Sequence, residues 1–309
     1  MRRRIAALLL ALTWPLTPSV QAAELFPLAD VRLTEGPFLQ AQDTDLRYLL
    51  ALDADRLLAP FLREAGLPAK TQSYGNWESS GLDGHMGGHY LSALALMVAS
   101  TGDTQALQRL NYVVAELKRC QEANSKNNSN GYLGGIPAGA KAWSELAEGK
   151  IAVDNFSLNG RWVPWYNLHK TYAGLLDAWR YAGNVEAREL LVGMADWALA
   201  LTDKLSDAQL QQMLTSEHGG MNEVFAELSA LSGEAKYLKL AQRFSHQQIL
   251  QPLQLGEDKL SGLHANTQIP KVIGFQRLAE LTGKKDWSRA ARFFWQTVRE
   301  QRTVAIGGN

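Results

Sequence analysis

The sequence has little cysteine, no net charge and no long apolar run beyond its N-terminus. Its single cysteine, Cys120, excludes a disulfide within the chain. Cys120 would lie on the same helical face as Leu110, Val113 and Leu117, so we expect a small core residue rather than a reactive thiol. Basic and acidic residues balance at 31 each, which leaves no basic excess for a nucleic-acid partner.

The N-terminus has the three regions of a secretory signal. Arg2-Arg3-Arg4 supply positive charge, residues 5–14 an apolar run, and Val20-Gln21-Ala22 a small-residue cleavage site. The apolar run is too short to span a bilayer, which makes a membrane anchor the weaker alternative. We expect residues 1–22 to be a signal peptide cleaved after Ala22, and the mature protein to be soluble, off the membrane, and periplasmic or secreted.

Short glycine turns divide most of the chain into repeated units. Gly102, Gly183, Gly233 and Gly283 each separate a mostly apolar helix from an amphipathic one. The last three recur at a constant interval of 50 residues, the mark of a repeated supersecondary unit. The pattern therefore predicts a helical hairpin repeated four times.

The two helices of each hairpin differ in pattern. Residues 90–99 and 224–231 are apolar nearly all round, which is typical of helices buried on all sides. The helices after the turns carry one apolar stripe and one polar face that would be exposed to solvent, as at 287–298. An inner ring of helices inside an outer ring is an α/α toroid; an open superhelical solenoid is the alternative. We predict an all-α fold, with an irregular lead-in at 23–42, a partial toroid at 43–309 and one short strand at 303–306.

The chemistry is expected in the loops that lead into the inner helices. These loops, at 76–89, 161–169, 216–223 and 262–267, hold five of the six histidines, with several carboxylates and tryptophans. Parallel inner helices would bring the four loops together on one side of the barrel. Histidine at the same structural place in successive units predicts a shared cleft. The sixth histidine, His246, is expected on the surface of an outer helix.

Aromatic residues in these loops suit the binding of a sugar. Trp77, Trp162, Trp165 and Tyr166 would stack on the apolar face of a sugar ring, whose hydroxyls need polar partners. The alternative is that these rings fill gaps between helices.

Polar residues of the same loops also have two interpretations. His85 and His89 lie one helical turn apart and would face the same way, but an isolated pair is weak support for a metal. Glu78 would supply a carboxylate to that site or cap a helix. Glu217 and His218 either meet substrate or hydrogen-bond the backbone of a tight Gly-Gly turn.

Several motifs together resemble one family. Residues 33–309 are similar, in order and spacing, to the β-L-arabinofuranosidase group of glycoside hydrolases, families 127 and 146. The motifs are WESSGLDGHMGGHYLSALA, NGYLGGIPAG, VPWYNLHKTYAGLLDAW, EHGGMNEVFAEL, GLHANTQIPKVIGFQRLAELTG and AIGGN. The resemblance implies an (α/α)6 barrel followed by β-sandwich domains. It also implies release of terminal β-L-arabinofuranose with retention, by a zinc-bound cysteine thiolate and a glutamate acid/base.

The resemblance further implies which part of the site this chain holds. In the family, the catalytic glutamates and zinc-binding cysteines follow the segment matched by 307–309, and Cys120 matches none of those cysteines. We therefore expect catalytic residues and zinc ligands only beyond Asn309, and no metal in this chain. His169 and His264 match histidines that hydrogen-bond the arabinose; a third falls near His218 or Met221.

We predict the N-terminal part of an exported glycosidase that acts on arabinofuranosides of plant glycans, with a carbohydrate as its partner. If the barrel ended at Asn309, we would expect an unstable protein without hydrolytic activity. The alternatives are another α/α-toroid carbohydrate enzyme (uronide hydrolase, lyase or epimerase) and a non-catalytic sugar-binding helical-repeat protein. The predicted substrate-binding residues are His169, His264, Trp165, Trp77, Glu78, His85, His218 and Glu223.

Overall fold

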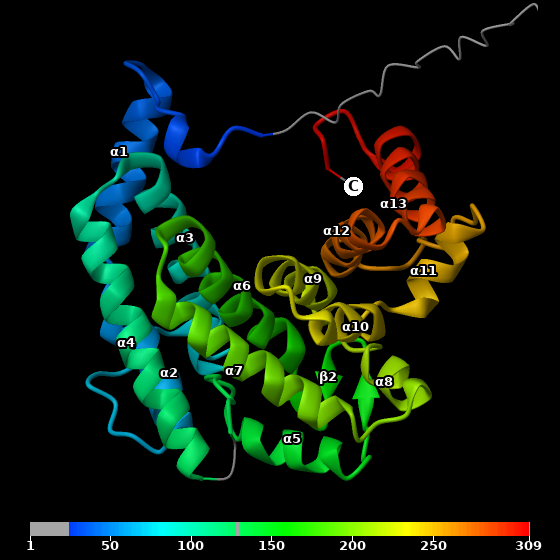
Figure 1. The fold of residues 1–309 in the computed structure, drawn as a ribbon, viewed down its shortest axis with the longest axis horizontal. Helices are drawn as coiled ribbons and strands as arrows, with labels where there is room; N and C mark the ends of the chain where they lie inside the picture. Colours follow the sequence, from blue (N-terminus) through cyan, green and yellow to red (C-terminus); the bar gives the residue numbers. More distant parts are fainter. Residues whose placement is uncertain (1–24, 128–129, 309) are drawn as a thin grey trace, which may run out of the picture.

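The computed structural model describes residues 25–127 and 130–308. The predicted signal peptide and its cleavage site lie outside the described residues. Most of the described chain is helical, and its helices follow an arc from α1 to α13 (Figure 1). Within the described ranges, no helix combines the length and the apolar character that a membrane crossing requires.

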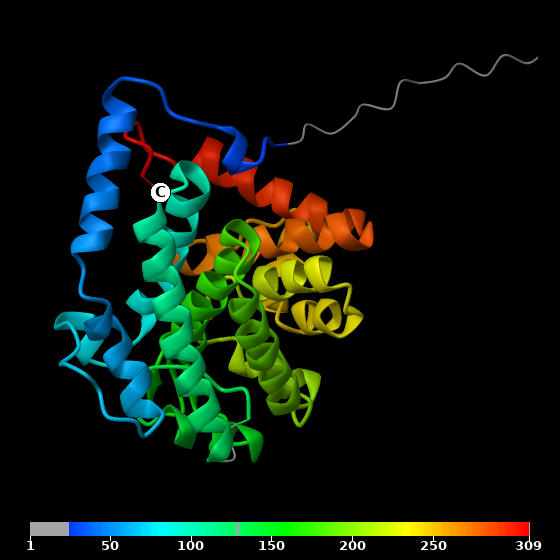
Figure 2. The same ribbon diagram turned by 60° about the vertical axis from the view of Figure 1, so that its left-hand side comes forward.

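Four helical hairpins form the body of the protein. The inner helices are α3 (His85–Thr101), α6 (Pro164–Ala182), α9 (Met221–Ser232) and α12 (Ala265–Thr282). The outer helices that follow them are α4 (Thr104–Lys126), α7 (Val185–Thr202), α10 (Ala235–Arg243) and α13 (Lys285–Thr297). The inner helices succeed one another along the arc and the outer helices lie outside them (Figures 1 and 2). The predicted all-α toroid class is confirmed.

The glycine turns are where the sequence predicted them. Gly102, Gly183, Gly233 and Gly283 each end an inner helix with a positive φ of 73°, 66°, 76° and 70°. A side chain with a Cβ is strained in this left-handed conformation, and glycine adopts it freely. The four predicted hairpins are therefore confirmed, and each reverses the chain through one glycine.

Helices α3 and α6 approach each other most closely through glycines. A Cβ on Gly88 would lie 2.2 Å from the carbonyl carbon of Lys170, and one on Gly174 would lie 2.5 Å from the carbonyl oxygen of Gly88. Only the absence of side chains at these two positions lets the backbones meet. This packing fixes the start of α3 beside the start of α6, where His89 and His169 lie.

Helix α1 begins earlier than the periodicity predicted. It spans Pro37–Ala51, so helical structure starts at Pro37 rather than Asp43 and the irregular lead-in is shorter than 23–42. Pro37 suits the first turn, where a missing N–H group leaves no hydrogen bond unmade. The other helices are α2 (Ala54–Glu64), α5 (Gly139–Ala147), α8 (Asp207–Met213), α11 (Gln247–Gln254) and the short turns η1 (Leu28–Asp30), η2 (Asn76–Ser79) and η3 (Val298–Arg302).

The strand predicted at 303–306 is wrong, because these residues form a turn after η3. Instead, β1 (Val153–Asp154), β2 (Ser157–Leu158) and β3 (Arg161–Trp162) form a small antiparallel sheet in the loop before α6. Asn159 and Gly160, both with positive φ, connect β2 to β3, and Leu158 pairs with Arg161. Asn-Gly between paired residues is a hairpin signal that the sequence did contain.

The core lies between the inner and outer helices. Cys120 is fully buried with Leu110, Val113 and Leu117, which confirms it as a small core residue. Burial raises the pKa of its thiol to about 12. Residues 224–229 of α9 are buried on all sides, as predicted. Helices α3 and α12 are not, since Leu96 and Ile273 are 40% and 54% exposed.

Candidate functional site

The loops that lead into α6 and α9 meet at the turn Gly219-Gly220. A Cβ on Gly219 would lie 2.6 Å from Nδ1 of His169, so only glycine lets the turn close over this ring. A Cβ on Gly220 would lie 3.0 Å from Nε2 of His169 and 3.4 Å from Oε2 of Glu223. His169 and Glu223 therefore border the same glycine from two different helices.

His169 is a buried imidazole without hydrogen-bond partners. Its ring is 9% exposed, and neither Nδ1 nor Nε2 has a partner among the described residues. Burial lowers its pKa to about 3, helped by the nearby charge of Lys170 and by His89. The ring is therefore neutral at physiological pH, with one nitrogen to donate and one to accept a hydrogen bond.

Glu223 is a carboxyl group held near its point of titration. Its pKa is raised to about 7. Burial is the main cause, and the neighbouring carboxylates Glu227 and Asp177 also raise the pKa, whereas the guanidinium groups of Arg180 and Arg277 lower it. Near neutral pH the group exists in both forms, so it can donate or accept a hydrogen bond.

Glu217 connects this group to the start of α12. Burial raises its pKa, although His264, Lys170 and Lys271 act in the opposite direction. His264 is the exposed N-cap residue of α12, and its ring lies edge-on to Phe156, with centroids 6.3 Å apart. His169 and Glu223 thus border the glycine turn, and His264 lies near Glu217, two residues before that turn.

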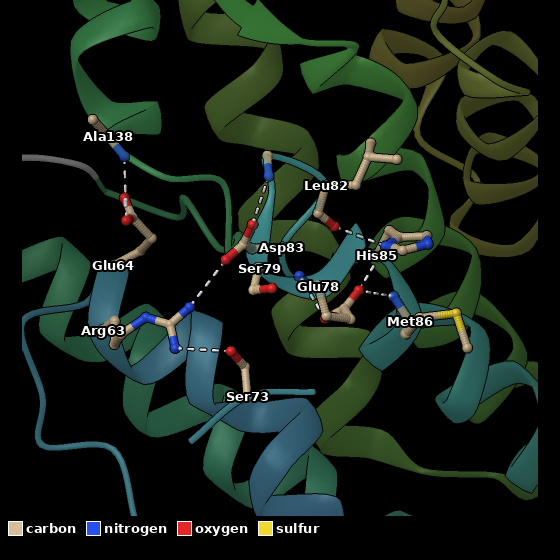
Figure 3. A network of polar contacts seen from close by, with 12 residues as sticks. Arg63, Glu64, Ser73, Glu78, Ser79, Leu82, Asp83, His85, Met86 and Ala138 are labelled. Carbon is tan, nitrogen blue, oxygen red and sulfur yellow. Dashed lines mark hydrogen bonds and ion pairs between the residues drawn. The ribbon is translucent and has the colours of Figure 1, made fainter. Parts of the chain in front are cut away.

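A second polar group lies at the start of α3 (Figure 3). Oε1 of Glu78 is 2.6 Å from Nδ1 of His85. The Glu78 carboxylate also accepts hydrogen bonds of 3.0 Å from the N–H groups of Gly84 and Met86. Because the carbonyl oxygen of Leu82 is also 2.7 Å from Nδ1, this nitrogen faces two acceptors and must carry the proton.

The second group borders a cavity of about 720 Å³ between α1, α2 and α3. Trp77 is 62% exposed and its ring lies 6.4 Å from that of His85. Tyr48, Tyr74 and Tyr90 supply further aromatic walls. Apolar rings around a few polar groups are typical of small-molecule sites. The predicted Trp77, Glu78 and His85 therefore share one cavity.

His85 and His89, weighed as metal ligands from the sequence, meet no third ligand among the described residues. His85 and His89 lie edge to face with ring centroids 6.0 Å apart. Across 25–127 and 130–308, no three histidine, cysteine, aspartate or glutamate side chains are placed to hold a metal ion. Cys120 is buried in α4.

The prediction that Trp165 stacks on a substrate is wrong. Trp165 is 1% exposed and lies in the core, with ring centroids 4.9 Å from Trp143 and 5.1 Å from Phe244. Its Nε1 donates to the sulfur of Met213 at 3.1 Å. Helix α6 begins at Pro164, which turns Trp165 inward; Trp162, one residue before the turn, stays 38% exposed.

Two further histidines, His218 and His246, are buried. His218 is fully buried, its Nδ1 lies 3.0 Å from the carbonyl oxygen of Ser216, and its Nε2 has no partner among the described residues. His246, expected on the surface, is 5% exposed. The N-cap position of α11 directs His246 inward, where Nδ1 meets Nζ of Lys271 at 3.3 Å.

The sequence analysis missed Lys271. This residue on α12 is 2% exposed and lies within reach of His246 and Gln268. A lysine among the apolar residues of an inner helix was the available signal, because a buried ammonium group is rare without a specific role.

The fold and the polar loops define an α/α-toroid protein with groups of polar residues at the starts of its inner helices. Residues 30–309 match the family described as "Beta-L-arabinofuranosidase, GH127 catalytic domain". The chain belongs to this family of glycoside hydrolases.

Solved structures agree with the fold. Ara127N-Se, a GH127 β-L-arabinofuranosidase from Geobacillus stearothermophilus T6, aligns with a TM-score of 0.57 at 14% identity, over 87% of this chain and 45% of that one. The GH127 β-arabinofuranosidase BT3674 aligns with a TM-score of 0.56 at 14% identity, over 88% of this chain and 43% of that one. The chain thus spans less than half of each. None of the curated proteins compared with it matches.

Proposed function

We propose that this chain forms the sugar-recognition part of an exported, retaining β-L-arabinofuranosidase that acts on arabinofuranosides of plant glycans. Membership of the GH127 family supports the glycosidase class. The charged, apolar and small-residue regions within 2–22 support export to the periplasm or the medium.

The unpaired imidazole of His169 carries the proposal. A buried polar atom without a partner costs about 1–3 kcal/mol, so natural proteins rarely leave two on one ring. A hydroxyl group of a bound sugar would pair with one of the two nitrogens, as donor or as acceptor. His169 would then bind the arabinofuranose through a neutral ring.

Neighbouring residues would complete the contacts with the sugar. Glu223, whose pKa lies at about 7, accepts or donates as a hydroxyl requires. His264 approaches from α12, beside the exposed ring of Phe156. Trp77 and the Glu78–His85 pair would form a further wall of the site at the start of α3.

We assign the nucleophile and the general acid/base to none of the described residues. We expect both, with the zinc that holds a thiolate, in sequence that would follow the Gly-Gly segment at 307–308, as the family resemblance implies. In this proposal the described residues orient the sugar and exclude water from it, and they form or break no bond.

Titration of the 309-residue chain with methyl β-L-arabinofuranoside tests the proposal. We expect saturable binding, weaker binding of the α anomer, and loss of about tenfold or more in affinity in His169→Ala, as for a lost buried hydrogen bond. Lys239→Ala, on the exposed face of α10, is the control and should bind like the parent. Equal affinity of parent and His169→Ala would overturn the proposal.

A further inference from the structure

Lys271 is a buried cation that no carboxylate among residues 25–127 and 130–308 contacts at hydrogen-bond distance. Its side chain is 2% exposed, and its Nζ donates to Oε1 of Gln268 at 3.1 Å and meets Nδ1 of His246 at 3.3 Å. Both partners are neutral, since burial lowers the pKa of His246 to about 3. An ammonium group has three donors, so at least one stays available.

The nearest opposing charge is Glu217, which acts on Lys271 only at longer range. Glu217 shares its charge with Lys170 and His264. Buried charges are normally paired at hydrogen-bond distance, because the loss of hydration must be compensated. Lys271 therefore lacks the anion that such a position requires.

Lys271 faces a cavity of about 550 Å³. The cavity lies between the starts of α11 and α12 and the turn between β1 and β2, which contributes Asn155 and Phe156. His246 and His264 line it beside Lys271, and no aspartate or glutamate of the described chain does. Its volume falls in the range of small-ligand sites. The lining is therefore neutral or basic throughout.

We propose that this cavity is a subsite for the carboxylate of a uronic acid, a sugar unit adjacent to the arabinofuranosyl group. This assignment rests on the proposed function, because His264 would stand between the two sugar units. The uronate carboxylate accepts a hydrogen bond from the free N–H of Lys271 and supplies the counter-charge that this ammonium group lacks.

The other walls of the cavity suit a sugar ring rather than an inorganic anion. Phe156 is 46% exposed and offers an apolar face to ring C–H groups. Asn155, Thr215 and Gln248 offer neutral hydrogen-bonding groups for hydroxyls. Phosphate and sulfate sites usually combine several cationic or backbone donors, whereas this cavity has one lysine.

A comparison of D-galacturonate with D-galactose tests the subsite, because the two differ only in the carboxylate. We expect the 309-residue chain to bind galacturonate about tenfold or more tightly, as a charge-assisted hydrogen bond requires. Lys271→Met should remove this preference, and Lys259→Met, on an exposed loop lysine, should keep it. Equal binding of both sugars, or a preference that survives Lys271→Met, overturns the proposal.

A second variant guards against a folding defect in Lys271→Met. Gln248 is exposed and lines the cavity, so Gln248→Glu would give Lys271 a counter-charge from within the protein. We expect it to weaken galacturonate binding about tenfold more than galactose binding, because only galacturonate competes for the cation. If inorganic sulfate binds as tightly as galacturonate, the site is a general anion site and the uronate assignment fails. Methyl β-L-arabinofuranoside titrated in parallel separates the proposals, because its binding does not require Lys271.

Discussion

Nδ1 of His85 lies 2.6 Å from Oε1 of Glu78, at the start of the helix that opens the first hairpin. The carboxylate also accepts from two backbone N–H groups, of Gly84 and Met86. Glu78 is 3% exposed, so its oxygens hold the loop, the first turn of α3 and the imidazole together.

Glu78→Gln should therefore destabilise the fold. An amide has only one oxygen, so it cannot accept from all three donors and leaves a buried N–H unpaired, at a cost of about 1–3 kcal/mol. Urea unfolding measures the change, with Glu122→Gln on the exposed face of α4 as control. An unchanged unfolding midpoint for Glu78→Gln would contradict the described role of this carboxylate.

Gly88→Ala should disrupt the packing of α3 against α6. The added Cβ would lie 2.2 Å from the backbone of Lys170, which cannot move without displacing the helix. We expect a loss of about 3 kcal/mol in the free energy of unfolding, at the upper end for overpacking. Gly75→Ala is the control, because a Cβ there meets nothing within 4 Å. Similar thermal stability of the two variants would exclude this close approach.

Trp165→Ala and Trp77→Ala should differ in their effect on stability. Removal of the buried Trp165 leaves a cavity in the core, with a loss of about 3–5 kcal/mol in stability. Trp77 is 62% exposed, and its removal should change stability by less than about 1 kcal/mol. Calorimetric unfolding compares the two. A Trp165→Ala variant as stable as the parent would contradict the core position of this ring.

His246 should make stability depend on pH in acid. Its pKa is about 3 in the folded protein, against 6.5 for an ordinary histidine, so below pH 6.5 the unfolded chain binds a proton that the folded chain does not. Its contribution therefore falls by about 1.4 kcal/mol per pH unit as pH drops from 6.5 towards 3, and is constant above 6.5.

The variant His246→Gln isolates this effect. Glu223, with a pKa raised to about 7, penalises the folded state in the opposite direction as pH rises from 4.5 to 7. The difference between parent and variant cancels that term. We expect urea-unfolding free energies of the two proteins to diverge between pH 7.5 and pH 5; parallel curves would mean that His246 is not held neutral.

The local sequence predicted the hairpins because their signals are local. Glycine at 102, 183, 233 and 283 ends each inner helix through its own left-handed conformation, and apolar periodicity marks which helix is buried. The Asn-Gly hairpin signal of the small sheet, at 159–160, was also present in the local sequence. Two-residue strands were missed because they are too short to show alternation.

The candidate site was suggested in part by the sequence, since histidines at helix starts marked the loops in which its residues lie. The sequence did not distinguish the core residue Trp165 from the exposed residue Trp162. Their different settings depend on where α6 begins, at Pro164, which lies between them. His246 and Lys271 meet across 25 residues of sequence. Such a contact depends on how α11 packs against α12, which no local pattern records.

Nuclear magnetic resonance of the imidazole nitrogens tests the central claim most directly. The chain would be labelled with ¹⁵N-histidine and His169 assigned by its loss in His169→Ala. The account predicts a neutral His169 ring from pH 5 to pH 8, as its pKa of about 3 requires, and a shift of at least one ring nitrogen on addition of methyl β-L-arabinofuranoside. Saturating ligand that moves other histidines and leaves both nitrogens of His169 unshifted would contradict it.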